Sequence, residues 1–320
     1  MGNIVKKITL LMFIMIALTL FGCNSTKSEN KIKVLVPSGI PFVAVGDLID
    51  QKDIVIDSVI GPDLLITGMI SKSHDIIIAP LNVGAKLYLN ESSNYKLDST
   101  ITFGNTYIVS RKSNTLNTIE DLNDKNILAY GKNSIPDILL KKALDSNEIK
   151  AEISYQGGID QVIPFFICNP KYPDDVSCNP PDYILCAEPL ITKLELEYNM
   201  DLNILDLQAE SGSKLIPQAA IFINPESENL KEINIILNLI KANVEYLNNN
   251  PKEYANKIVN KHSYFKNLGV KIIESSIPRS NINYLNLSDN IEIYENFFEM
   301  LNNYNPNLLG GKIPDSEFYR

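Results

Sequence analysis

Short runs of apolar and β-branched residues alternate with helical patterns along most of this sequence, and this alternation limits its possible folds more than any other feature. Such runs occur at residues 31–36, 75–79, 126–130 and 183–187, and a helical spacing of apolar residues follows each of them. Continuous apolar runs are typical of parallel strands that are covered on both faces. Strands that alternate with helices favour βαβ units and parallel sheets. The sequence therefore predicts an α/β protein.

Two further segments refine this expectation. Residues 99–110, STITFGNTYIVS, have the composition of one long strand with Gly104 and Asn105 in its middle. A glycine inside a strand marks a bulge or a close backbone approach. After Pro225 the spacing of apolar residues becomes helical, and it predicts helices over 230–247, 251–260 and 291–302. No internal repeat and no low-complexity linker separates independent domains.

The N-terminus has the composition of an export signal. Two lysines precede an apolar run over residues 8–21, and a polar stretch follows Cys23. A basic region, an apolar core and a small residue before the cleavage point are the parts of a secretory signal. Leu20-Phe21-Gly22-Cys23 resembles the lipobox of bacterial lipoproteins, which implies cleavage before Cys23 and lipidation of that residue by acyl chains such as palmitate. The alternative is an uncleaved N-terminal anchor helix, and both interpretations place the folded body outside the cytoplasm.

Charge and cysteine content exclude some functions and favour a compartment. The formal net charge is −9, and because the first 22 residues carry two lysines and no acid, the remainder carries −11. Nucleic-acid binding needs a basic face, so we expect no nucleic-acid partner. Cys168 and Cys178 flank a proline-rich polar loop, and an exported protein can keep a disulfide there. Cys186 lies in an apolar run, which predicts a buried residue. The two histidines have no zinc-ligand spacing, so we expect neither a metal site nor a cofactor.

Four turns follow apolar strands and precede helices: 37–39, 79–82, 131–134 and 188–189. Ligands of open α/β sheets bind at the carboxyl ends of strands, where the next helix presents free N–H groups. Serine and asparagine in these turns can either cap the helix or bind a ligand, and the sequence leaves both roles open. No phosphate-binding loop and no nucleophile turn is present in the sequence, so we expect no enzyme activity.

The order of several segments resembles one family. They are KVLVPSGIPFVAV, HDIIIAPLNVGAKLYL, GNTYIVSR followed by TIEDLNDKNILAYG, PDYILCAEPLITKL, IPRSNINYL, and the ending NPNLLGGKIPDSEFYR. Together, behind a lipobox, they resemble the solute-binding lipoproteins of ABC importers, of the nitrate/sulfonate/taurine type that includes proteins similar to thiamine-precursor binders. The resemblance implies an α/β, class II periplasmic-binding-protein fold, with two lobes joined by a hinge of two chain crossings.

The resemblance also implies a domain plan and a site. The signal peptide would cover residues 1–22, the tether 23–31, one lobe 32–105 plus 219–320, and the other lobe 106–218. The crossings would lie near Asn105-Thr106 and Pro217-Gln218. By position, the ligand contacts of the family correspond to Ser38, Phe42, Leu81, Asn82, Asn105, Asn133, Ser134, Glu188 and Gln218.

The function implied is capture of a small solute by hinge closure and its delivery to an ABC permease, by a monomer anchored to the cell membrane. The alternatives are an enzyme on the same fold, of the pyrimidine-synthesis type, and a surface sensor or adhesin with no transport role. Few basic residues occur at the strand-end turns, which favours a neutral or weakly cationic heteroaromatic solute, such as a vitamin precursor, over a sulfonate. Phe42 or Tyr107 would stack on such a solute, and Glu188 would accept its N–H groups.

Overall fold

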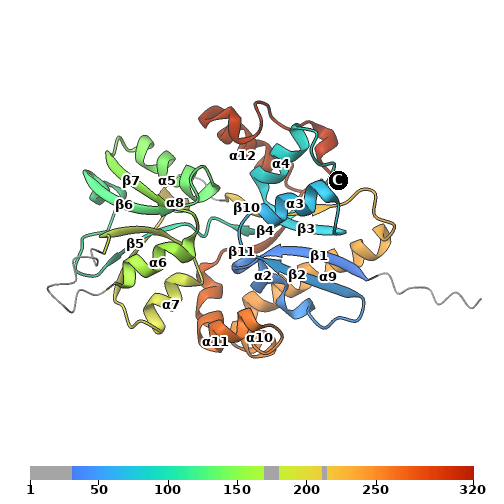
Figure 1. Ribbon diagram of the computed structural model, residues 1–320, viewed down its shortest axis with the longest axis horizontal. Helices are drawn as coiled ribbons and strands as arrows, with labels where there is room; N and C mark the ends of the chain where they lie inside the picture. The colour runs from blue at the N-terminus through green and yellow to red at the C-terminus, as the bar shows by residue number, and fades with distance from the viewer. Residues whose placement is uncertain (1–30, 169–179, 211–214) are drawn as a thin grey trace, which may run out of the picture. The chain divides into compact units, whose positions relative to one another are not determined.

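Two β-sheets organise the residues that the computed structural model describes, which are 31–168, 180–210 and 215–320 (Figure 1). The six-stranded sheet has the order β11-β4-β10-β3-β1-β2, and the five-stranded sheet has the order β7-β6-β8-β5-β9. The strands of the larger sheet are β1 Ile32–Pro37, β2 Ile54–Val59, β3 Ile76–Pro80, β4 Lys96–Phe103, β10 Pro217–Ile223 and β11 Ile282–Asn286. Those of the smaller sheet are β5 Tyr107–Arg111, β6 Lys125–Tyr130, β7 Ala151–Gln156, β8 Tyr183–Cys186 and β9 Leu202–Asp206.

Both sheets are mixed, so the expectation of parallel sheets is correct for only part of each. β1 pairs in parallel with β2 and β3, and β6 pairs in parallel with β7 and β8. β10 is antiparallel to β3 and β4, and β5 is antiparallel to β8 and β9. The antiparallel direction of β10 follows from the end of the sheet at which the chain re-enters it. Ala219, near its start, pairs with Pro80 at the end of β3, so β10 runs in the opposite direction.

Helices cover both faces of the six-stranded sheet. They are α2 Ile40–Val45, α3 Asp63–Ser71, α4 Leu81–Leu89, α9 Leu230–Asn249, α10 Pro251–Ile258, α11 Ser263–Ser276 and α12 Ile291–Tyr304. Alternate residues of β1 point to opposite faces, as strand geometry requires. Val34 and Val36 pack in a core with α2, α9, α10 and α11, whereas Leu35 packs in a second core with α3, α4 and α12.

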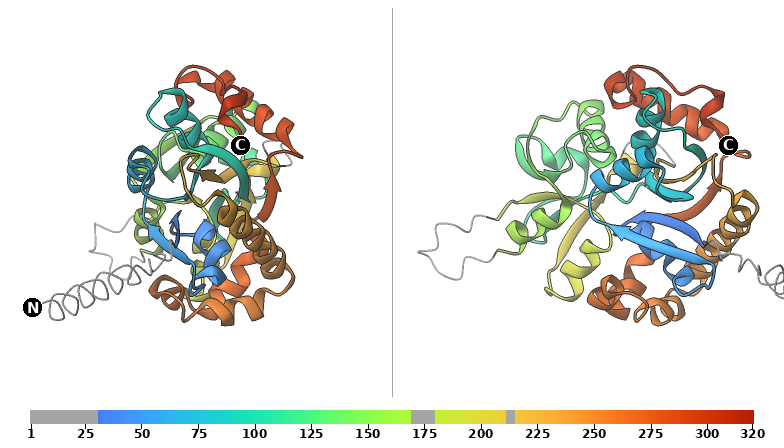
Figure 2. Two further views of the ribbon diagram at one scale, coloured as in Figure 1. Left: turned by 90° about the vertical axis from the view of Figure 1, so that its right-hand side faces the viewer. Right: turned by 45° about the vertical axis from the view of Figure 1, so that its right-hand side comes forward.

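The five-stranded sheet is covered in the same way by α5 Ile135–Ser146, α6 Ile159–Ile167, α7 Leu190–Leu196 and α8 Leu207–Glu210. Ile127 packs on the α5 side and Leu128 on the α6 and α7 side. The N-terminal half of α5 is an exception, because Ile135 and Ile138 belong to the same apolar cluster as α4 and α12 of the other sheet. The two sheets with their helices lie on opposite sides of the middle of residues 32–320, as the right-hand view of Figure 2 also shows.

The predicted long strand over residues 99–110 is wrong. β4 ends at Phe103 in one sheet and β5 begins at Tyr107 in the other. The intervening Gly104 and Asn105 have φ of 55° and 49°, a left-handed conformation that interrupts a strand. A Cβ on Gly104 would lie 2.5 Å from Gln208 Oε1, so a larger residue would displace that side chain, and the positive φ also favours glycine here. The apolar residues on either side conceal this break in the sequence.

The chain returns to the larger sheet after α8, and the two crossings contact one another. The Gly104 N–H donates to the Ile216 carbonyl at 3.0 Å, and the Leu207 N–H donates to the Thr106 carbonyl at 3.0 Å. The side chain of Gln218, already the second residue of β10, donates to the Thr106 hydroxyl at 3.3 Å. Residues Ile32–Arg320 form one compact unit, and the lobe boundaries given above stay a prediction.

Other expectations for local structure are partly confirmed, because the helices expected over residues 230–247, 251–260 and 291–302 are present as α9, α10 and α12. α11 and β11 were not anticipated as elements, because Gly269 and several polar residues interrupt the apolar spacing of α11, and three of the five residues of β11 are polar or aromatic. Among the described residues, no helix is both long and apolar enough to cross a membrane.

Candidate functional site

Two predicted ligand contacts, Asn82 and Ser134, carry buried polar atoms that have no partner. Asn82 is the second residue of α4, and only 7% of it is exposed. Its Oδ1 atom makes no hydrogen bond, and neither does the Ser134 Oγ atom. Ser134 is the N-cap residue of α5, but its side chain does not cap the helix. The capping role that the sequence left open is therefore absent at both positions.

These two residues come from different sheets but lie next to a shared apolar cluster. Asn82 follows β3 of the six-stranded sheet, and Ser134 follows β6 of the five-stranded sheet. Their neighbours Leu81 and Ile135 both belong to the cluster that joins α4, α5 and α12. Five other described residues also carry an unpaired buried side-chain atom, namely Asn94, Ser99, Thr100, Asn243 and Asn302. Only Asn82 and Ser134 lie at helix starts, one from each sheet, and this position is what indicates a place where another molecule supplies the partner.

The turn before α5 is held by a buried carboxylate that the sequence did not identify as part of the site. Asp137 is fully buried and accepts hydrogen bonds from the Asn133 N–H, the Lys141 Nζ and the Tyr155 hydroxyl, each at 2.7 Å. The bond to Asn133 fixes that residue at φ 66°, with its side chain exposed. Asp137 thus positions the turn that ends at Ser134. An aspartate in the first turn of a helix after a strand-end turn was the available signal.

Three other predicted contacts already have internal roles. The Ser38 hydroxyl lies 2.9 Å from the Ser58 hydroxyl of β2. Phe42 is fully buried, and its ring centroid lies 4.5 Å from that of Phe265. Leu81 is fully buried in the cluster described above. Phe42 therefore packs in the core of the larger sheet, and stacking on a solute would require that core to open.

Asn105 and Glu188 interlock at the first crossing. The Asn105 side-chain amide donates to the Glu188 carbonyl at 3.2 Å, and the Glu188 N–H donates to Asn105 Oδ1 at 2.8 Å. Glu188 lies between β8 and α7, and its peptide bond to Pro189 is cis. Asn105, Glu188 and Gln218 therefore all belong to the region where the chain passes between the sheets.

The Glu188 carboxylate is occupied by protein groups. Its Oε1 atom accepts from Arg279 Nε at 2.6 Å, and its Oε2 atom accepts from the Thr192 N–H at 3.0 Å. Burial raises the pKa of Glu188, and the Arg279 guanidinium and the Thr192 N–H oppose that rise. Tyr107 is also engaged, because its hydroxyl donates to the Arg279 carbonyl at 2.5 Å. Contact between Glu188 and a solute would require one of its bonds to open.

Arg279 was missed by the sequence analysis, although it is one of only three arginines in the chain and lies in the quoted segment IPRSNINYL. A rare arginine next to a proline turn was the available signal. Its partners lie far away in the sequence, so no local pattern could identify them.

The cysteine predictions have different outcomes. Cys186 is free and fully buried, as predicted, and burial raises the pKa of its thiol to about 12, which keeps it unreactive. Cys168 is disulfide-bonded. Cys178 and Cys23 lie outside the described residues, so the pairing of Cys168 with Cys178 and the lipidation of Cys23 stay predictions. In the described parts of the chain, no three His, Cys, Asp or Glu residues gather in a way that could hold a metal.

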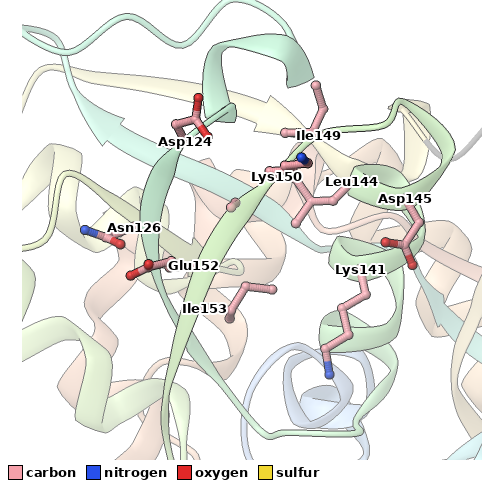
Figure 3. A pocket seen from close by; sticks show the side chains of 10 residues that line it. Asp124, Asn126, Lys141, Leu144, Asp145, Ile149, Lys150, Glu152 and Ile153 are labelled. Carbon is pink, nitrogen blue, oxygen red and sulfur yellow. The ribbon is translucent and has the colours of Figure 1, made fainter.

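A separate pocket of about 580 Å³ lies at the edge of the five-stranded sheet (Figure 3). Its lining comes from the end of α5, from residues 149–150 and from β6 and β7, and it contains none of the predicted contacts. Lys141, Asp145 and Glu152 give it both signs of charge, and it holds no unpaired buried polar side-chain atom. We therefore place the candidate site at Asn82 and Ser134 and not in this pocket.

Comparison with solved structures identifies the fold. An ABC transporter protein from Parabacteroides distasonis is similar with a TM-score of 0.75 at 22% identity, covering 91% of this chain and 99% of that one. The alkanesulfonate-binding protein SsuA from Xanthomonas axonopodis pv. citri, bound to MOPS, has a TM-score of 0.65 at 12% identity, with coverage of 91% and 98%. A Candida albicans protein described as having the generic periplasmic binding protein fold has a TM-score of 0.50 at 12% identity, with coverage of 90% and 92%.

No protein-family model matches the sequence, and no curated protein does so either. The structural similarity, together with two mixed sheets joined by two adjacent crossings, shows the class II periplasmic-binding-protein fold. Each sheet with its helices is one lobe of that fold.

Proposed function

We propose that this chain is the solute-binding component of an ABC importer, and that it holds a small organic molecule between the two lobes. The fold supports this proposal, as do the similar solved structures, which include an ABC transporter protein and an alkanesulfonate-binding protein. The predicted export signal over residues 1–22, followed by Cys23, supports an extracytoplasmic position with a lipid anchor. A permease that receives the solute is the partner this function requires.

The observation that carries the proposal is the pair of unpartnered atoms, Asn82 Oδ1 and Ser134 Oγ. A buried polar atom without a hydrogen bond costs about 1–3 kcal/mol. A protein that keeps two such atoms, one on each lobe, gives up stability that a bound solute can restore. This is the stability cost expected at a binding site.

The chemistry of the two positions limits the solute. Asn82 Oδ1 accepts a hydrogen bond, so the solute needs a donor group such as N–H or O–H. The free N–H groups at the starts of α4 and α5 favour a second group that accepts. Leu81 and Ile135 are buried beside these positions, so the surroundings of the site are apolar. A compact solute with both polar functions and an apolar part, either a heteroaromatic vitamin precursor or an amino-sulfonate, has these properties.

The structure changes the reasons for choosing between these classes. The heteroaromatic prediction depended on stacking by Phe42 or Tyr107 and on a free Glu188 carboxylate, and all three are engaged within the protein. We therefore keep both classes in the test and rank neither above the other.

A thermal-shift panel tests the proposal. Pyrimidines, vitamin precursors, alkyl sulfonates and amines are added to the purified full chain, and a solute at about 100 times its Kd should stabilise it by about 2.7 kcal/mol. Asn82→Leu should melt at or above the wild-type temperature without solute, because it removes an unpaired polar atom, and should lose the solute-dependent shift. Ser134→Ala should behave in the same way.

Ser71→Ala, on the exposed end of α3, is the matched control and should keep the full shift. The proposed site is wrong if a stabilising solute shifts Asn82→Leu and Ser134→Ala as much as the wild type. The proposed function is wrong if no class of solute in the panel stabilises the wild-type protein.

An enzyme on this fold remains the principal alternative class. It would need a reactive group at the site, whereas Cys186, the one described free thiol, is buried and protonated. Turnover of the stabilising solute by the purified protein would support the enzyme. Recovery of the solute unchanged after incubation would support the binding protein, and solute uptake that depends on a permease would separate transport from sensing or adhesion.

A further inference from the structure

One guanidinium group connects the two lobes through three side chains. Arg279 Nε donates to Glu188 Oε1 at 2.6 Å, and Arg279 Nη2 donates to Glu195 Oε2 at 2.5 Å. Nη1 donates to Glu195 Oε1 at 3.2 Å, and Nη2 also donates to the Thr192 hydroxyl at 3.0 Å. We refer to Arg279, Glu188, Thr192 and Glu195 as the clamp.

The two sides of the clamp are anchored in different cores. Arg279 ends a short 3-10 helix, Ile277–Arg279, and Ile277 is buried in the core that α2, α9 and α11 form on the six-stranded sheet. Thr192 and Glu195 lie on α7, whose Ile191 and Leu194 are buried in the core of the five-stranded sheet. A movement of one lobe relative to the other therefore acts directly on the bonds of Arg279.

The geometry of these bonds restricts such movement. The two bonds to Glu195 form a bidentate pair, which requires the guanidinium and carboxylate planes to stay aligned. The Glu188 side chain is fully buried, so water cannot replace Arg279 as the partner of its carboxylate when the contact breaks. Arg279 and Glu195 are 34% and 31% exposed at their side chains, which leaves this end of the clamp accessible to solvent.

The clamp is also connected to the crossings of the hinge. Glu188 interlocks with Asn105 through two backbone–side-chain hydrogen bonds, and the Arg279 carbonyl accepts from the hydroxyl of Tyr107, the first residue of β5. A rotation about the first crossing thus moves Asn105, Glu188 and Arg279 together.

We infer that Arg279 is a positioning residue that sets the angle between the lobes, and that its clamp must break or stretch when the lobes rotate. Through Glu188 it also keeps the one carboxylate of the predicted site away from a solute. The effect of the clamp on solute binding rests on the proposed function, whereas its effect on the lobe angle does not. Without the clamp, the lobes sample a wider range of angles, so the population of the binding-competent arrangement changes and the solute affinity changes with it.

Distance measurements between spin labels test the inference without any solute. Labels are placed by Ser113→Cys, after β5, and by Glu245→Cys, on α9, both of which are exposed positions on different lobes. The full chain carries Cys23→Ser in addition, and the buried Cys186 stays unlabelled. Double electron–electron resonance then gives the distance distribution between the lobes.

Glu195→Gln and Arg279→Gln should both broaden this distribution or shift its mean relative to the unmodified clamp. Arg279→Lys keeps the positive charge but cannot form the two parallel hydrogen bonds of the guanidinium. Its distance distribution should therefore be narrower than that of Arg279→Gln but broader than that of the wild type. Lys193→Gln, which removes an ion pair to Glu197 on the same helix, is the matched control and should leave the distribution unchanged. Circular dichroism confirms that each variant is folded.

Unchanged distributions in both Glu195→Gln and Arg279→Gln would overturn the inference, whatever the outcome of the solute panel. If a panel solute binds, Glu195→Gln should change its Kd by about fivefold or more, within the range of ordinary coupling between sites. A broadened distribution with unchanged affinity would overturn the part that concerns solute binding. If no panel solute binds but the variants broaden the distance distribution, the proposed function is refuted, and the inference that the clamp sets the lobe angle stands.

Discussion

The replacement Arg279→Met tests how strongly the clamp stabilises the folded protein. It removes a guanidinium that is about one-third exposed but leaves Glu188, whose side chain is fully buried, without its charged partner. Loss of one member of a buried ion pair costs about 3–5 kcal/mol. Because the guanidinium is partly hydrated, we expect the lower end, about 3 kcal/mol, or about 6–12 °C in Tm.

The loss should depend on pH in a direction that the structure fixes. Burial raises the pKa of Glu188 in the wild type, and Arg279 opposes that rise. Without Arg279 the folded-state pKa rises further above the unfolded value of about 4.3. The folded variant then binds a proton that the unfolded chain releases, so its stability falls as pH rises from about 4.3 through the raised folded pKa. The deficit relative to wild type should be larger near pH 8 than near pH 5.

Urea unfolding at both pH values, with a double-mutant cycle, is the assay. Arg279→Met/Glu188→Gln should recover most of the loss and show no pH dependence in this window, because no buried charge remains. Lys193→Met, which removes an exposed pair on α7, should cost less than about 1 kcal/mol. The reasoning is refuted if Arg279→Met costs no more than Lys193→Met, or if its deficit is the same at both pH values.

Three further predictions concern other positions, each checked by urea unfolding. Asp137→Asn should destabilise the protein by about 2–4 kcal/mol, because one buried carboxylate accepts three hydrogen bonds; a loss below about 1 kcal/mol would contradict that role. Gly84→Ala should lower the free energy of unfolding by about 1–3 kcal/mol, because the new Cβ would lie 2.2 Å from the Phe222 ring. An unchanged urea midpoint would contradict this and show that α4 can shift away from Phe222 at no cost. Burial tends to raise the pKa of Asp47, but bonds from two lysines lower it overall. Its contribution of about 1 kcal/mol should therefore be present above pH about 4 and lost as pH falls through the lowered folded value, so the gap between wild type and Asp47→Asn should close in acid; a constant gap would exclude this linkage.

The fold was largely predictable because its local signals agree. Apolar runs over residues 75–79 and 126–130 became β3 and β6, and each precedes a helix as expected. The local pattern did not predict the break at Gly104, because the residues on both sides favour strands; only the family resemblance placed a chain crossing near Asn105-Thr106. The direction of β10 depends on where the chain re-enters the sheet, which no local pattern records.

The candidate site was only partly predictable. Asn82 and Ser134 were found from their places after strands, and the structure adds that their polar atoms are unpaired. Phe42 has the same position relative to β1, but tertiary packing places it in the core. The role of Glu188 depends on Arg279, which is 91 residues away in the sequence, so their contact was beyond a reading of local motifs.

Hydrogen–deuterium exchange with the solute that gives the largest thermal shift tests the central claim most directly. The account predicts that bound solute slows exchange in the first turns of α4 and α5, at residues 81–85 and 134–138, on both lobes together. Protection confined to the edge pocket around residues 149–153, or to one lobe alone, would contradict it.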